Sequence, residues 1–230
     1  MNITEQTAVG DIAGALPSSI RVFQRHGIDF CCGGRTPLGV ACQDRGVSFT
    51  EVARAIAAAD ETPVERDWSR EPLPLLIDHI IATYHDSLRE DLPRLELMAA
   101  QVARVHGAKD ARLSRIDALV RELSVDLRLH MMKEEKVLFP ALRVLARNGD
   151  SAAAIAAPIA VMEQEHDDAG AMLTDLRRLG DDYTPPLWAC NTMKALYQGL
   201  SELESQMHAH VHLENNILFP RALGRDDARG

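Results

Sequence analysis

Apolar side chains recur at helical spacing along the chain beyond residue 74. In LLIDHIIATYHDSLREDLPRLELMAAQV they return every three or four positions, which places them on one face of a helix. The same pattern continues in three further segments, separated by GAKD, RNGD and GDDYTPP, which are rich in turn and capping residues. The pattern predicts four long helices, at about 75–106, 111–147, 153–179 and 187–222. Pro93 is expected to kink or interrupt the first of them.

Shorter helical segments precede this region. PSSIRVFQRHG, TPLGVACQDRG and SFTEVARAIAAAD begin with proline or capping residues, and the first two end in glycine. They predict a small helical domain at residues 1–60, followed by a proline-rich, charged linker at 61–74. Four amphipathic helices with short connections most simply form an antiparallel bundle, here at 75–224. The predicted fold class is therefore all-α, a four-helix bundle preceded by a small helical domain.

Composition supports a helical, globular protein. The chain is 46% hydrophobic but 4% aromatic, and Ala, Leu, Arg and Glu dominate, which favours helix over sheet. A net charge of −9 argues against a nucleic-acid partner, because an acidic surface repels phosphates. The sequence MNITEQTAVG does not resemble a secretory signal, and no run approaches the ~20 apolar residues that span a bilayer. We therefore expect a cytoplasmic protein without a membrane partner, whose cysteines are thiols or ligands.

A sequence phrase occurs twice in the predicted bundle. HMMKEEKVLFP at 130–140 is echoed by HVHLENNILFP at 210–220, each with a His followed four residues later by a Glu. The pair His85-Asp86 in YHDS is likewise echoed by His166-Asp167 in EHDD. The four helices therefore look like a duplicated hairpin, with His-Asp on its first helix and His-x-x-x-Glu on its second.

The His-to-Glu spacing has a direct chemical meaning. Four residues along an α-helix advance ~6 Å and rotate ~40° past a full turn, so both side chains face the same way. Bundles that hold two iron or manganese ions use inward-facing Glu and His in this manner, and burying such polar groups is costly without a cation. Zinc also fits chemically. The candidate metal ligands are His85, His130, Glu134, His166, His210 and Glu214.

The levels of these residues along the helices test the metal hypothesis. Around the first two connecting loops, the candidate ligands of neighbouring antiparallel helices lie at similar distances from the loop. Around the third loop, His166 and His210 are offset by ~15 Å at 1.5 Å per residue. An extended GDDYTPP segment can absorb this offset, since seven residues span ~25 Å.

Other polar residues receive different interpretations. Asp86 and Asp167 either orient an imidazole of another helix or form surface salt bridges. His26, His79, His208 and His212 are predicted not to bind metal. His26 is expected to interact with a helix C-terminus, and the other three to face away from the ligands. Cys42 and Cys190 are predicted to be packing residues.

Cys31 and Cys32 are adjacent in IDFCCGG. Their Cα atoms lie ~3.8 Å apart, below the usual disulfide range, so a bond between them would be strained. Gly33 and Gly34 permit tight turning and close approach of another backbone. Two interpretations remain open: small buried side chains beside a turn, or a thiol relay, NO-reactive site or transient iron ligand.

The ordered motifs DFCCGG, DHIIATYHD, RVHG, HMMKEEKVLFP, VMEQEHDDAG and HLENNILFPRAL resemble a known family. The bundle resembles hemerythrin-like di-iron domains, and the chain from about 8 to 224 resembles the bacterial di-iron proteins called repair of iron centres. The resemblance implies two non-haem iron ions held by the four ligand histidines, with Glu134 and Glu214 bridging. The family pattern also has a His matching His106, which we interpret as a helix-end or access residue, because it lies ~31 Å from His85 along a straight helix.

The function that this resemblance implies is the restoration of damaged iron–sulfur clusters during nitrosative or oxidative stress. Iron donation and nitric oxide reduction are the implied mechanisms, with damaged iron–sulfur proteins as partners and nitric oxide or oxygen as small ligands. The alternatives are an oxygen-binding or sensing protein of hemerythrin type without turnover, and a ferroxidase-like iron store. The DFCCGG segment favours repair, with Cys31 and Cys32 as a candidate catalytic thiol relay, because a simple oxygen carrier needs no second, thiol-bearing domain.

Overall fold

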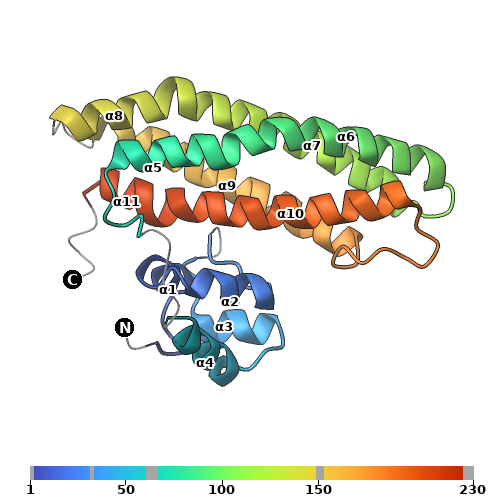
Figure 1. Cartoon of the computed structure of the whole chain (residues 1–230), viewed down its shortest axis with the longest axis horizontal. Coiled ribbons are helices and arrows are strands. Elements are labelled where there is room, and N and C mark those ends of the chain that lie inside the picture. The colour runs from blue at the N-terminus through green and yellow to red at the C-terminus, as the bar shows by residue number, and fades with distance from the viewer. Residues whose placement is uncertain (1–2, 32–33, 61–66, 149–152, 225–230) are drawn as a thin grey trace. The chain divides into compact units, whose positions relative to one another are not determined.

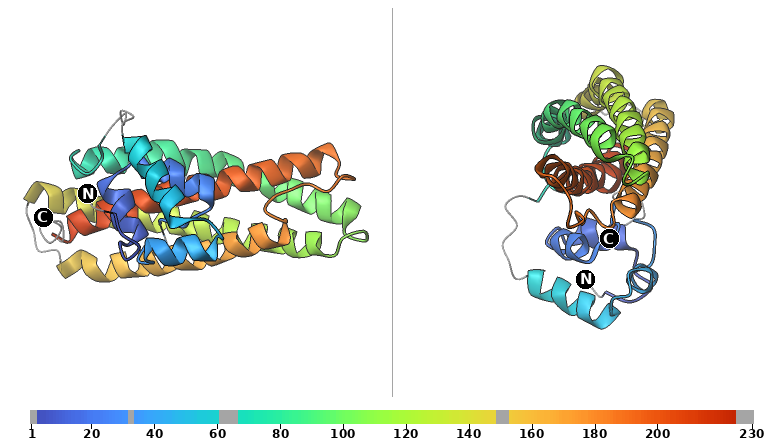
Figure 2. Two further views of the ribbon diagram at one scale, coloured as in Figure 1. Left: turned by 90° about the horizontal axis from the view of Figure 1, so that it is seen from below. Right: turned by 90° about the vertical axis from the view of Figure 1, so that its right-hand side faces the viewer.

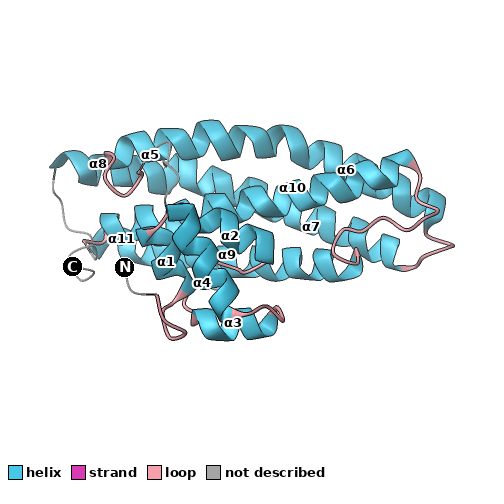
Figure 3. Cartoon of the chain, turned by 60° about the horizontal axis from the view of Figure 1, so that its bottom comes forward, coloured by secondary structure: helices cyan, strands magenta, loops and turns pink. Residues whose placement is uncertain are grey.

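A computed structural model describes residues 3–31, 34–60, 67–148 and 153–224. Helix is the regular secondary structure of these residues, and no strand occurs among them (Figure 3). The predicted all-α fold class is therefore confirmed. Contacts divide the chain into two compact units. One comprises Met1–Asp78, Leu142–Ile159 and His208–Gly230, and the other comprises His79–Ala141 and Ala160–Met207.

The second unit is built from four long helical segments. They belong to α6 (Asp86–His106), α7 (Arg112–Lys133), α9 (Ala153–Leu179) and α10 (Asn191–Leu213). The segments run alongside one another (Figure 1), and the end-on view in Figure 2 shows them grouped around a common interior. Buried leucines from all four fill that interior, including Leu92, Leu119, Leu173 and Leu200. Burial of these apolar stripes is the main force that holds such a bundle together.

Three short π-helical turns interrupt the long helices. They are η1 (Ile81–His85) after α5 (Leu73–Ile80), η2 (Glu134–Leu138) before α8 (Phe139–Asn148), and η3 (Glu214–Leu218) before α11 (Phe219–Ala222). The N–H after each turn donates to a carbonyl five residues earlier, as from Phe139 to Glu134 and from Phe219 to Glu214. Pro140 and Pro220 follow the last two turns, and a wider turn gives the proline ring room against the preceding carbonyls. These turns were not predicted from the sequence.

The first unit contains the short N-terminal helices α1 (Val9–Ala15), α2 (Ser19–His26), α3 (Leu38–Asp44) and α4 (Phe49–Asp60). Their own hydrophobic core includes Ile12, Phe23, Phe30, Leu38 and Ile56, none more than 1% exposed. Gly27 and Gly46 have φ of 63° and 65° and follow α2 and α3, as the glycine pattern predicted. The helix α1 was not predicted.

Two glycines let separate backbone segments touch. The Gly10 N–H donates to the Gly34 carbonyl at 2.7 Å. A Cβ on Gly10 would lie 3.0 Å from that oxygen and 2.9 Å from Asn216 Oδ1, closer than side-chain carbons normally come. The close backbone approach predicted for the CCGG segment is thus confirmed at Gly34, whereas Cys32 and Gly33 lie outside the described residues.

Two predictions were wrong, the start of the fourth long helix and the packing of Cys190. The helix begins at Asn191, not at about 187, because residues 186–189 form a separate turn in which the Ala189 N–H donates to the Pro186 carbonyl at 2.9 Å.

α6 continues through Pro93, so of the kink or interruption expected there, the interruption does not occur. Cys190 is exposed and does not pack in the core. Among the described residues, no helix combines the length and apolarity needed to cross a membrane.

Candidate metal centre

Glu134 is surrounded by predicted ligands within the second unit. His85 ends η1, His130 lies on α7 and Glu134 begins η2, and all three side chains are at most 4% exposed. Oε2 of Glu134 lies 3.3 Å from Nε2 of His85, and Oε1 lies 3.4 Å from Nε2 of His130. The carboxylate thus presents a different oxygen to each imidazole, which is the arrangement that a carboxylate needs to bridge two metal ions.

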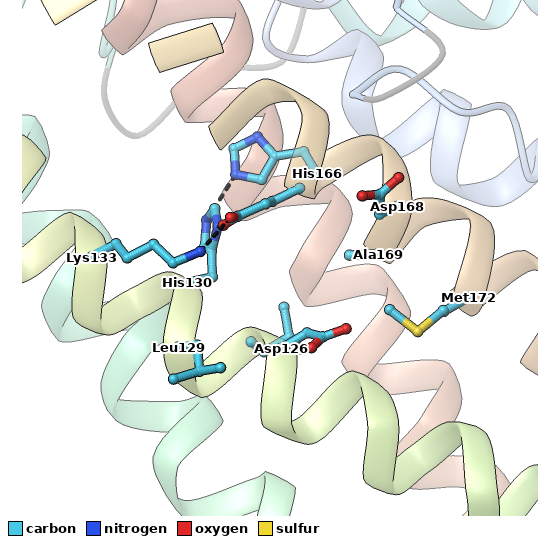
Figure 4. A pocket seen from close by; sticks show the side chains of 10 residues that line it. Asp126, Leu129, His130, Lys133, His166, Asp168, Ala169 and Met172 are labelled. Carbon is cyan, nitrogen blue, oxygen red and sulfur yellow. Dashed lines mark hydrogen bonds and ion pairs between the residues drawn. The ribbon is translucent and has the colours of Figure 1, made fainter. Parts of the chain in front are cut away.

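His166 of α9 completes this group. Its Nε2 lies 3.0 Å from Nε2 of His130, as the dashed line in Figure 4 marks, and both rings are buried. Two nitrogen ligands at a right angle on one ion, each at about 2.1 Å, lie about 3.0 Å apart. The observed separation therefore fits two imidazoles that share a metal ion.

The outward nitrogens of two of these histidines contact carboxylates. Nδ1 of His85 donates to Glu135 at 2.7 Å, and Nδ1 of His130 donates to Glu165 at 2.9 Å. A proton held on Nδ1 leaves Nε2 as the lone-pair donor, which is how proteins commonly set the tautomer of a metal-binding His. Both Nε2 atoms point toward Glu134, so the protein prepares these two rings as ligands.

Cationic side chains hold the outer carboxylates in their charged form. Glu135 also accepts from Arg89, and Glu165 from Lys133. Burial by itself raises the pKa of Glu135, but the hydrogen bonds from His85 and Arg89 outweigh it and lower the pKa. For Glu165, burial is likewise outweighed by the hydrogen bonds from Lys133 and His130, and the pKa is lowered. Both groups are therefore carboxylates at neutral pH.

Glu135 and Glu165 were not predicted from the sequence. Asp86 and Asp167 were the candidates for orienting an imidazole, with salt bridges as the alternative, but Asp86 forms an exposed ion pair with Arg89, and Asp167 is exposed. The alternative of a surface salt bridge is thus the correct one for Asp86. The available signal was sequence adjacency, since Glu135 follows one candidate ligand and Glu165 precedes another.

The second copy of the repeated phrase places its ligands similarly. Nε2 of His210 lies 3.2 Å from Oε1 of Glu214, and both side chains are buried. His212 faces elsewhere, as its rotation predicts, and its Nδ1 accepts from Nδ2 of Asn216 at 3.1 Å. Burial lowers the pKa of His212 to about 4, so that ring is neutral at neutral pH.

The candidate ligands form two overlapping sets. In each set, one potential ligand atom per residue lies within 4.8 Å of the others. Within the second unit, the first contains His85 and Glu134, and the second contains His130, Glu134 and His166. Glu134 belongs to both, so this unit contains a candidate His/Glu metal site with a shared carboxylate.

A cavity opens beside the second set. It has a volume of about 220 Å³ and is lined by His130, His166, Lys133, Ala169 and Met172, among others (Figure 4). The ion pair between Lys133 and Glu165 lies on its wall. The cavity gives a small molecule a route to the imidazoles of α7 and α9.

The remaining candidate residues lie apart from these sets. His106 is at the end of α6, where its Nε2 lies 3.3 Å from Sγ of Cys190, and it belongs to neither set. This placement agrees with its interpretation as a helix-end residue. Cys31 is buried in the first unit, and Cys32 lies outside the described residues.

Comparison with known proteins identifies two matching family models. Residues 76–222 match the hemerythrin HHE cation binding domain. Residues 5–60 match a model named ScdA_N, described as a domain of unknown function.

Related proteins match nearly the whole chain. An iron-sulfur cluster repair protein YtfE from Musicola paradisiaca is 42% identical over 95% of this chain and 96% of its own length. Proteins of the same name from Citrobacter koseri and Escherichia coli are 40% identical over 94% of this chain and 96% of theirs. The similarity therefore extends over both matched regions and the segment between them.

Proposed function

The chain belongs to the hemerythrin HHE cation-binding family, and on this premise we propose that it is an iron protein that restores damaged iron–sulfur clusters. The name of its relatives, iron-sulfur cluster repair protein, supports the assignment over nearly the full length. The observation that carries the proposal is the placement of Glu134 between His85 and His130, with one oxygen toward each.

In this proposal the site binds two iron ions per chain. The proposed ligands are the four histidines and two glutamates that the sequence predicts, with Glu134 and Glu214 bridging. Imidazole and carboxylate together suit iron, and burial of six such groups is favourable when cations compensate them. With four protein ligands at each ion, octahedral iron retains positions for a small ligand.

The chain's own residues then define the chemistry. Glu135 and Glu165 accept hydrogen bonds from Nδ1 of His85 and His130, which orients each ring with its Nε2 toward Glu134. The cavity beside His130 and His166 admits a small ligand, with nitric oxide or oxygen as the candidates. Bound iron supplies redox chemistry and iron for transfer.

A repair assay tests the function. Apo full-length chain reloaded with iron(II) is incubated with a purified [4Fe–4S] enzyme inactivated by nitric oxide, and recovered client activity is measured. We expect recovery with the iron-loaded chain and little with Glu134→Gln, which loses a bridging oxygen and binds less than two irons. Glu122→Gln, an exposed change on α7, is the matched control.

The same samples distinguish the alternatives. Reversible oxygen binding without any recovery of the client would overturn the repair proposal in favour of an oxygen carrier or sensor. Two irons bound by Glu134→Gln would refute the bridging assignment.

The cysteine segment contributes to repair in this proposal. Cys31→Ala combined with Cys32→Ala should leave the iron content at the bundle unchanged but reduce recovery of the client. Unchanged recovery would remove the thiols from the proposed function and leave Cys31 as a packing residue.

A further inference from the structure

A second group of metal-binding side chains lies in the first unit. Asp29, Cys31 and His208 each offer one ligand atom, and these atoms lie within 4.8 Å of one another. Cys31 is 4% exposed, whereas Asp29 and His208 are half-buried, so the group is reachable from solvent on one side. We propose that these three side chains form a second metal site, which takes one divalent transition-metal ion such as iron(II) or zinc.

The segment before the double glycine already aims two ligands at one point. Oδ1 of Asp29 accepts from the Cys31 N–H at 2.9 Å and from the Cys31 thiol at 3.2 Å. Because the thiol proton lies between sulfur and oxygen, a metal ion can replace it there with both atoms as ligands. Metal binding then releases the proton, since thiolate is the ligand form of cysteine.

The third ligand comes from the C-terminal part of the same unit. The ring of Phe30, which is fully buried, meets the His208 ring edge to face with centroids 5.9 Å apart. The Phe30 carbonyl accepts from Nδ2 of Asn216 at 3.3 Å. These two contacts hold the Asp29–Cys31 segment against α10, which carries His208, and against η3, which carries Asn216.

This site is separate from the His/Glu site. His208 and His210 are two residues apart on α10, which corresponds to ~200° of rotation and ~3 Å of rise. His210 and His208 therefore lie on opposite faces of one helix, and His208 is the one that meets Cys31. From the sequence, His208 was predicted not to bind metal, and the proposal departs from that prediction by assigning it to a separate ion.

The donor set indicates the kind of site. Sulfur, nitrogen and oxygen ligands together favour iron(II) or zinc over magnesium or calcium. Three protein ligands leave at least one coordination position open, unlike the four-ligand sites that serve structure alone. A site with an open coordination position suits a metal ion that exchanges. The proposed site would give a role to a region whose family model is described as being of unknown function. The proposal that this site binds metal does not rest on the repair function.

Cobalt(II) is a suitable probe, because cobalt–thiolate bonds absorb in the near ultraviolet whereas cobalt bound by His and Glu does not. The reduced, metal-free, full-length chain is titrated anaerobically with cobalt(II), and absorbance and released protons are followed. We expect a thiolate band whose final intensity corresponds to one thiolate-bound cobalt per chain, with release of the Cys31 proton. Cys31→Ser should abolish the band, and Asp29→Asn or His208→Gln should weaken binding at least tenfold.

Matched controls separate this site from other thiols. Cys32→Ser and Cys42→Ser should retain the band, and every variant should retain the iron content of the bundle, which also reports correct folding. No thiolate band in the unmodified chain, or a band that survives both Cys31→Ser and His208→Gln, would overturn the proposal. A missing di-iron centre with the band intact would instead count against the proposed iron function alone.

Discussion

The metal centre depends on side chains that touch the ligands as much as on the ligands themselves. His130 donates through Nδ1 to Glu165, which Lys133 in turn holds, and His85 has the equivalent arrangement with Glu135 and Arg89. Each chain of contacts runs from a surface cation through a carboxylate to a buried imidazole. The outer carboxylate fixes the tautomer of the ring and increases the basicity of its Nε2.

Glu165→Gln is expected to weaken metal binding without removing a ligand. The amide carries no negative charge and can present an N–H to His130, so the ring loses its preferred tautomer. We expect affinity to fall by about 10- to 100-fold, the usual effect of losing such a partner. Competition with a chelator of known affinity measures the change. Glu163→Gln, two residues away on α9, is the control, and equal affinities for both variants would contradict the assigned role.

At the scale of elements, each π-turn coincides with a candidate ligand. His85 ends η1, Glu134 begins η2 and Glu214 begins η3. A π-turn accommodates one more residue than an α-turn and changes the direction of the side chains around it, and such turns are frequent at functional sites. The turns therefore set the directions of three ligands while the helices on either side continue.

Deletion of Val137 tests the role of η2. Val137 is 62% exposed, so its side chain contributes little packing, and its removal permits the turn to close as an ordinary α-turn. We expect helix content by circular dichroism to remain and iron content to fall, because Glu134 rotates away from His85 and His130. Val137→Ala, which keeps the residue count, should retain iron. A deletion variant with full iron content would show that the turn is not needed.

Asp110 and Arg112 interact at the start of α7. Oδ1 of Asp110 accepts from the Arg112 N–H at 3.0 Å, and its carboxylate pairs with the Arg112 guanidinium, which also reaches Asp181. The side-chain hydrogen bond from Arg112 lowers the pKa of Asp110, while partial burial opposes this effect. The charged form of Asp110 is thus favoured in the folded chain.

Asp110→Asn should lower the free energy of unfolding at neutral pH by about 0.5 kcal/mol, because Asn can still accept from the Arg112 N–H but loses the ion pair with the guanidinium. A lowered pKa stabilises the fold above the unfolded-state pKa of about 3.9, and this contribution is lost as pH falls through the folded-state value. The free energies of unfolding of the unmodified chain and of Asp110→Asn should therefore become equal at acidic pH. Urea unfolding at several pH values measures them, with Glu122→Gln as control. A difference that persists at pH 2 would contradict the role of the charge.

At the scale of the whole molecule, burying the polar side chains of the metal site destabilises the fold, and bound cations offset this effect. Six buried His and Glu side chains occupy space that apolar residues would otherwise fill. A ligand that binds the folded chain more strongly than the unfolded chain stabilises it by mass action. The stability of the bundle is therefore coupled to its metal content.

Removal of metal should lower Tm by several degrees at fixed protein concentration, measured by calorimetry before and after chelation. Iron(II) added back should restore it. In Glu134→Gln the difference between loaded and metal-free samples should shrink, because that variant binds less metal. An identical Tm with and without iron in the unmodified chain would contradict this coupling.

Much of the fold follows from local sequence patterns. Apolar periodicity predicted the four long helices, because burial of one face every 3.6 residues leaves a direct trace in the order of residues. The helix ends at Gly27 and Gly46 followed from glycine's access to positive φ. The helix α1 and the late start at Asn191 were missed, since neither has a strong local signal.

The sequence by itself determined which residues are candidates for metal binding. The repeated His-x-x-x-Glu and His-Asp phrases identify His85, His130, Glu134, His166, His210 and Glu214, because helix geometry makes spacing equivalent to direction. The tertiary structure alone decided which carboxylates orient the rings, where π-turns redirect the ligands, and that Asp29 and Cys31 meet His208. These features join residues far apart in the chain, and their distances depend on how whole elements pack, which no local pattern encodes.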